Sequence, residues 1–233
     1  MVLSALTAGL FTWGITTLGA LTVLTPFPPR GKITAALSGF GGGVMLASLF
    51  FSLLLPAIER AGGWLWPTLG TLAGGAAVFL FEKFFPKADT GLLSALSVTL
   101  HNFPEGMAVG VAFAAPGAEA AAVALAIGIG VQNFPEGAAV ALPLHARGLS
   151  RGRAFLLGSL SGAIEPLGAL LGVCAAQLSA LTLPFLLAFS AGAMLCVTVG
   201  DLLPEAYAQS RSAATLGLLP GFLLMTILDV ALG

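Results

Sequence analysis

Long apolar stretches separated by short polar connections run the whole length of the chain. Of its 233 residues, 58% are hydrophobic and 8% are charged, whereas a soluble domain carries about a quarter charged residues. A helix that crosses a bilayer needs roughly 20 mostly apolar residues. We expect such spans over residues 3–25, 33–57, 64–82, 91–114, 119–144, 153–177, 181–206 and 213–232. The pattern predicts an all-α integral membrane protein, with eight transmembrane helices in a single domain covering residues 1–233.

The basic residues are distributed unequally between the two sides of these predicted helices. Only Arg60 follows an even-numbered span. The other Lys and Arg residues follow odd-numbered spans and are Arg30, Lys32, Lys83, Lys87, Arg147, Arg151, Arg153 and Arg211. Because cytoplasmic loops are rich in Lys and Arg, we expect the odd-to-even loops to be cytoplasmic. Both termini are then outside, in a multi-pass protein of the plasma or bacterial inner membrane.

One six-residue segment occurs twice. His-Asn-Phe-Pro-Glu-Gly at 101–106 returns as Gln-Asn-Phe-Pro-Glu-Gly at 132–137. The two copies fall near the middle of neighbouring antiparallel spans, so they can face one another at one depth. A weaker similarity links 43–56 with 192–204. Together these similarities predict inverted repeats in a 3+2+3 arrangement, an architecture that recurs in transporters with a midplane binding site.

Each copy of the motif places its glutamate between two other polar side chains on one helical face. Residues four apart lie within about 40° of each other around a helix, and residues three apart within about 60° on the other side. The first copy supplies His101, Asn102 and Glu105, and the second supplies Gln132, Asn133 and Glu136. Oxygen ligands with one imidazole suit hard and borderline divalent cations, so the motifs predict a metal site.

Glu165 adds a third carboxylate in the middle of the sixth predicted span, and no Lys or Arg falls deep inside any span. An unpaired carboxylate at the bilayer centre costs on the order of 2.5–3.5 kcal/mol even on the lenient insertion scale. The three glutamates must therefore bind metal, bind protons, or alternate between the two. Metal binding should displace protons, and such alternation is what a transporter needs.

The paired motifs, with the later Glu-Pro at 165–166, resemble the ZIP family of divalent metal transporters, and Gln132 resembles its GufA-like branch. The resemblance implies a binuclear centre and an elevator-type movement of one helix bundle that carries metal toward the cytoplasm. It also implies a homodimer. By motif, one metal site would use His101, Glu105, Gln132 and Glu136. The other would use Asn102, Asn133 and Glu165 with the two bridging glutamates.

Other residues are weaker candidates. Asp201 and Glu205, near the cytoplasmic end of the seventh span, could form part of the transport pathway, and so could Met45 and Met194. We expect the two cysteines, Cys174 among them, to be buried small hydrophobic residues.

The expected function is transport of Zn²⁺, with Fe²⁺, Mn²⁺, Co²⁺ and Cd²⁺ also compatible with the ligands. The metal is substrate, and no cofactor is expected. Partners are divalent ions and lipid, not nucleic acid. An intramembrane metalloenzyme is one alternative, although there is no His-Glu-x-x-His motif and only His101 of the two histidines lies in a span. A proton-coupled carrier of an organic substrate is another, although the motifs lack an aromatic or basic pocket.

Overall fold

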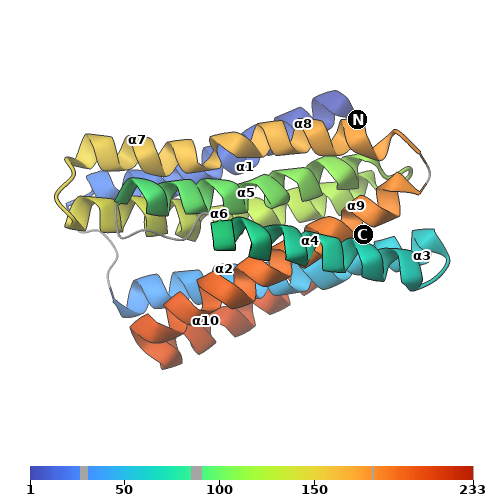
Figure 1. Ribbon diagram of the computed structural model, residues 1–233. Coiled ribbons are helices and arrows are strands. Elements are labelled where there is room, and N and C mark those ends of the chain that lie inside the picture. The colour runs from blue at the N-terminus through green and yellow to red at the C-terminus, as the bar shows by residue number, and fades with distance from the viewer. Residues whose placement is uncertain (27–30, 85–90, 180, 233) are drawn as a thin grey trace.

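The computed structural model describes residues 1–26, 31–84, 91–179 and 181–232 (Figure 1), except for the side chains of residues 82, 91–101 and 232. Its regular structure within these ranges is entirely helical. The first half contains α1 (Val2–Ala20), η1 (Leu21–Leu24), α2 (Lys32–Ser48), η2 (Leu49–Leu54), α3 (Leu55–Ala61), α4 (Leu65–Phe84) and α5 (Gly91–Ala114). The second half contains α6 (Glu119–Ala146), α7 (Arg151–Ser161), η3 (Gly162–Ile164), α8 (Glu165–Ala176), α9 (Thr182–Val197), η4 (Thr198–Leu202) and α10 (Leu203–Leu232).

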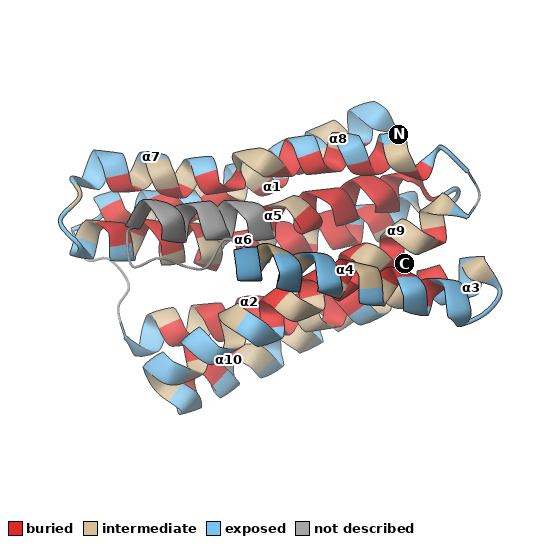
Figure 2. Cartoon of the chain, in the orientation of Figure 1, coloured by how far each residue is buried: buried red, intermediate tan, exposed pale blue. Residues whose placement is uncertain are grey.

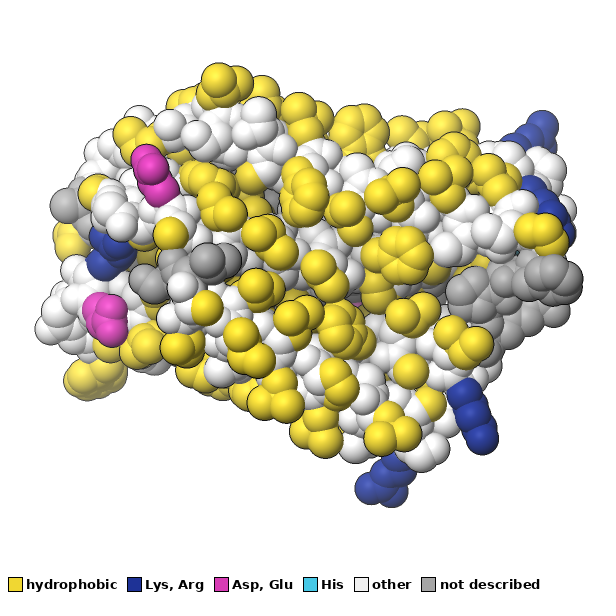
Figure 3. Space-filling model, turned by 180° about the vertical axis from the view of Figure 1, so that it is seen from behind, with side chains coloured by type: hydrophobic (Ala, Val, Ile, Leu, Met, Phe, Trp, Pro, Cys, Tyr) yellow, Lys and Arg dark blue, Asp and Glu magenta, His cyan; other side chains and the backbone are white. Residues whose placement is uncertain are grey.

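The helices have the length and composition of membrane helices. In the described chain, five stretches are long and apolar enough to cross a bilayer, and Leu65–Phe81 is a shorter apolar helix. One of the five, Thr182–Ala231, is interrupted at Ser210, whose φ of −166° and ψ of 104° are extended rather than helical. Figure 3 shows apolar side chains covering the middle of one face of the molecule, as expected of a surface that faces lipid. The all-helical membrane class is confirmed, while the number of crossings stays a prediction.

The helices form two groups (Figure 1). In the first, which we call the site bundle, α1 packs on α6 and α8, α5 packs on α8, and α7 packs on α1 and α6. In the second, the flanking bundle, α2 packs on α10 and α4 packs on α9. The two groups meet mainly where α6 contacts α2 and α10 and where α5 contacts α9. Buried residues concentrate along α2, α9 and the part of α5 after residue 101 (Figure 2).

Within each bundle, glycines let helices touch backbone to backbone. A Cβ on Gly106 of α5 would overlap the carbonyl oxygen of Glu165, and a Cβ on Gly39 of α2 would overlap that of Ala214. At Gly128, where α6 meets α10, the added atom would instead meet the flexible side chain of Met225. Close backbone contact of this kind is how membrane helices associate tightly, so the helices within each bundle are closely packed.

The weaker repeat has a structural counterpart. The π-helical segment η2 begins four residues after Met45 and is followed by Pro56, and η4 begins four residues after Met194 and is followed by Pro204. Single π-helical turns are rare and often mark functional positions. The same irregularity at equivalent places supports the relation between the two segments.

The prediction that both cysteines are buried is wrong for Cys174, which is exposed, and Cys196 has intermediate exposure. Its neighbours Ala169, Gly172, Val173 and Ala176 form the buried face of α8, so Cys174 lies on the outward face. An apolar side chain on that face is in keeping with lipid contact.

Candidate metal centre

The two motifs lie on adjacent helices of the site bundle. Both α5 and α6 stay helical through their motif prolines, Pro104 and Pro135. Asn102, Glu105, Gln132 and Asn133 are buried, whereas Glu136 has intermediate exposure. The side chain of His101 lies outside the described residues, so its role stays a prediction.

Glu105 is hydrogen-bonded to a residue of the neighbouring motif. Its side chain is 1% exposed, and Gln132 Nε2 donates a hydrogen bond to Glu105 Oε1 over 2.9 Å. This contact joins α5 to α6 at the depth of the motifs. It also shows that the two repeats face one another as their spacing predicts.

Glu165 lies at the start of α8, directly after the short 3-10 segment η3. Its carboxylate accepts hydrogen bonds from three helices: from Thr16 Oγ1 to Oε1 (3.0 Å), from Asn133 Nδ2 to Oε2 (2.7 Å) and from Asn102 Nδ2 to Oε1 (3.4 Å). The side chain is fully buried. Glu165 thus links α1, α5 and α6 to α8.

Five buried oxygens of the motif residues have no hydrogen-bond partner in the structure as described. They are Asn102 Oδ1, Glu105 Oε2, Gln132 Oε1, Asn133 Oδ1 and Glu136 Oε2. Carboxylate and amide oxygens are acceptors only, and buried acceptors are nearly always partnered in native proteins. A cation satisfies such oxygens, so this donor set fits a divalent metal ion as substrate.

The described carboxylates are not enough to ligate a metal ion by themselves. Among the described side chains, no three His, Cys, Asp or Glu residues are arranged to hold one metal ion. The amide oxygens of Asn102, Gln132 and Asn133 must therefore complete any ligand set built from the residues that the structure describes.

The four pathway candidates belong to the flanking bundle. Asp201 lies in η4 with intermediate exposure, and Glu205 is exposed in the first turn of α10. Met45 and Met194 are buried, and Met45 Sδ accepts a hydrogen bond from Thr198 Oγ1 (3.2 Å). Their part in transport stays a prediction.

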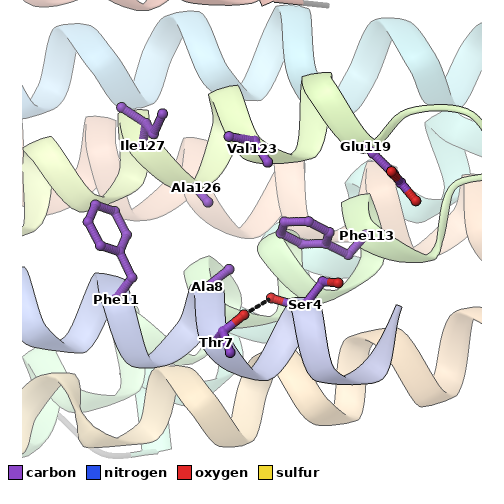
Figure 4. A pocket seen from close by; sticks show the side chains of 9 residues that line it. All are labelled: Ser4, Thr7, Ala8, Phe11, Phe113, Glu119, Val123, Ala126 and Ile127. Atoms are coloured by element: carbon purple, nitrogen blue, oxygen red, sulfur yellow. Dashed lines mark hydrogen bonds between the residues drawn. The ribbon is translucent and has the colours of Figure 1, made fainter.

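A separate pocket opens between the N-terminal part of α1, the end of α5 and the start of α6 (Figure 4). Its lining is largely apolar and includes Phe11 and Phe113, with the carboxylate of Glu119 and the hydroxyls of Ser4 and Thr7. Phe11 lies at the end of this pocket away from Glu119 (Figure 4). Because the lining contains none of the predicted ligands, the pocket is distinct from the oxygen cluster.

One contributor to the centre was missed from the sequence. Thr16 of α1 reaches Glu165, although α1 carries no copy of the motif. Its hydroxyl stands four residues from that of Thr12, and both threonines are on the buried face of α1. That spacing was the available signal.

A helical membrane protein with a buried cluster of unpartnered oxygens on two copies of one motif has the features expected of a metal-ion transporter. Comparison with known proteins places it within that class. The family model described as "ZIP Zinc transporter" matches residues 88–229, and the chain belongs to this family.

Several relatives are similar along their length. The chain is 40% identical to zinc transporter GufA of Myxococcus xanthus, over 99% of each chain. It is 37% identical to zinc transporter ZIPB of Bordetella bronchiseptica, over 98% of this chain and 81% of that one. It is 34% identical to zinc transporter ZIP11 of Homo sapiens, over 100% of this chain and 98% of that one. These relatives are transporters rather than enzymes, and the resemblance to the ZIP family and its GufA-like branch is confirmed.

Proposed function

We propose that the protein carries divalent metal ions, zinc foremost, toward the cytoplasm through the oxygen cluster of α5, α6 and α8. The observation that carries this proposal is the set of five buried, unpartnered oxygens on the two motifs. The names of the relatives support zinc as the substrate. Fe²⁺, Mn²⁺, Co²⁺ and Cd²⁺ are further candidates on the same ligand chemistry.

We propose that the centre holds two metal ions side by side. Glu105 and Glu136 bridge them, because each lies between two other ligands of its motif. His101 and Gln132 complete one site. Asn102, Asn133 and Glu165 complete the other.

The proposed orientation places both termini outside. Lys and Arg side chains gather at one end of the face in Figure 3, and acidic side chains lie at the other. Arg60, which the sequence predicts on the other side, follows Glu59 in the last turn of α3, and its guanidinium donates a hydrogen bond to the carbonyl oxygen of Pro116. Both chain ends in Figure 1 point toward the end that carries α3. This asymmetry fits the excess of basic residues on cytoplasmic loops.

Zinc uptake into proteoliposomes containing the purified protein tests the proposed function. The double variant Glu105→Ala, Glu136→Ala should abolish uptake, because it removes both bridging carboxylates. Glu119→Ala is the matched control, since Glu119 is an exposed carboxylate at the start of α6 and its loss should leave uptake unchanged. Uptake that survives in the double variant refutes the proposal.

We further propose that the site bundle moves against the flanking bundle, elevator fashion. Support comes from the backbone contacts within bundles and the side-chain contact between Gly128 and Met225. Cysteines at these two positions, bridged by Hg²⁺, should stop transport. A cysteine at Gly75 is the control, because its Cβ would lie 3.1 Å from Cys196 Sγ within the flanking bundle. A Hg²⁺ bridge between these two cysteines should leave transport intact. Full transport with the bundles bridged contradicts the movement.

The predicted homodimer also stays a proposal. Mass photometry of the protein in nanodiscs measures it directly, and a single-protomer mass would contradict it.

A further inference from the structure

Helix α1, which carries no motif, contacts the metal centre directly. The side chain of Thr16 is fully buried. Its Oγ1 lies 3.0 Å from Glu165 Oε1 and 3.2 Å from the carbonyl oxygen of Thr12. That same carbonyl lies 3.5 Å from Asn133 Nδ2. One turn of α1 therefore touches both Glu165 and Asn133.

Space for this contact is built into the surrounding helices. A Cβ on Gly162 would lie 2.8 Å from both Glu165 Oε1 and Thr16 Oγ1, which is closer than real Cβ contacts. On the other side, a Cβ on Gly137 would overlap the carbonyl oxygen of Thr16. Glycine at both positions lets Thr16 fit between α6 and η3.

The contact has a consequence for the ligands. Asn102 and Asn133 both use their amide N–H groups on Glu165. Because the amide nitrogen and oxygen are fixed in one plane, anchoring the nitrogen fixes the direction of the oxygen. Those oxygens, Asn102 Oδ1 and Asn133 Oδ1, are the unpartnered ones. The position of Glu165 therefore sets where two candidate metal ligands point.

We infer that Thr16 is a positioning residue of the metal centre, which holds the Glu165 carboxylate so that the oxygens of Asn102 and Asn133 face the metal. This role rests on the proposed function and extends it by making α1 the fourth helix of the site. Groups that orient metal ligands through hydrogen bonds typically contribute 10–100-fold to metal affinity.

Zinc titration of the detergent-purified full chain, followed by calorimetry, tests the inference. Glu165→Ala identifies the binding step that depends on this carboxylate. Thr16→Val keeps the shape but removes the hydroxyl, and should weaken that same step about tenfold or more. Thr16→Ser keeps a hydroxyl and should restore the zinc affinity of that step. Loss of packing alone would not give this result.

A second variant reaches the same contact by another route. Gly162→Ala leaves the hydroxyl in place but pushes Thr16 and Glu165 apart, and should reproduce the effect of Thr16→Val even if that variant folds poorly. Matched controls come from α1. Thr17→Val removes a hydroxyl that pairs with Ser159 Oγ instead, and Gly14→Ala fills open space, so both should bind zinc as wild type does.

The outcomes separate the inference from the proposed function. Wild-type affinity at the Glu165-dependent step in both Thr16→Val and Gly162→Ala overturns the positioning role and leaves the zinc site standing. A Glu165→Ala variant that binds zinc normally also overturns it. Wild-type protein that binds no zinc overturns the proposed function, and this inference with it.

Discussion

The substitution Gly106→Ala adds one methyl group where α5 touches α8. That methyl would overlap the carbonyl oxygen of Glu165 and lie 2.7 Å from its Cα. To reach ordinary contact distance α8 must retreat by about 1 Å. The hydrogen bond of 2.7 Å from Asn133 to Glu165 would then exceed the usual limit of about 3.2 Å. We expect overpacking to cost about 1–3 kcal/mol of folding stability.

Thermal unfolding and zinc titration measure the two effects of Gly106→Ala. The Tm should fall by roughly 2–4 °C per kcal/mol lost for a chain of this size, and zinc affinity should fall about 10–100-fold because the ligands shift. Gly14→Ala is the control, and it should raise the Tm rather than lower it. An added methyl there meets nothing within 4 Å, and alanine stabilises a helix interior by roughly 0.5–1 kcal/mol. If Gly106→Ala keeps wild-type zinc affinity and Tm, the reasoning from close packing is wrong.

Three further predictions concern the oxygen cluster. Gln132→Met removes both the donor to Glu105 and one unpartnered oxygen, so zinc affinity in a titration should fall about tenfold or more; unchanged affinity would exclude Gln132 as a ligand. Asn133→Asp replaces the donor to Glu165 with a carboxylate, so the metal-free protein should melt at lower temperature and zinc should stabilise it more than wild type. A smaller zinc-induced rise in Tm would contradict this. Zinc binding by wild type should release protons, which calorimetry in buffers of different ionisation enthalpy measures; equal heats in all buffers would show that none are released.

The repeated motif made the core of the site predictable. Each glutamate and its flanking polar residues could be placed on one helical face from spacing alone, and the structure brings Gln132 to Glu105 across the two helices. The separation of helices into two bundles was not predictable in this way, because apolar helices all carry similar stripes of small residues. Which glycine meets which backbone, as Gly106 meets Glu165, depends on the packing of the whole chain.

Thr16 shows a second limit. A hydroxyl in an apolar helix usually bonds to a carbonyl of its own preceding turn, as Thr12 Oγ1 does with the carbonyl oxygen of Gly9. From the sequence alone, the two threonines are therefore equivalent. The position of η3 beside α1 is what brings Glu165 to this face of the helix, where Thr16 Oγ1 donates to its carboxylate.

The three glutamates of the centre are equal in sequence but differ in their surroundings. The carboxylate of Glu165 is occupied by donors from Thr16, Asn102 and Asn133, whereas Glu105 and Glu136 each keep an oxygen without a partner. A carboxylate already held by several donors gains less from a cation than one with a vacant lone pair. Glu105 and Glu136, the proposed bridging pair, are thus the carboxylates with the most to gain from a metal ion, whereas Glu165 is already held by its neighbours without one. That division suits a carrier, whose site must survive each release of its substrate.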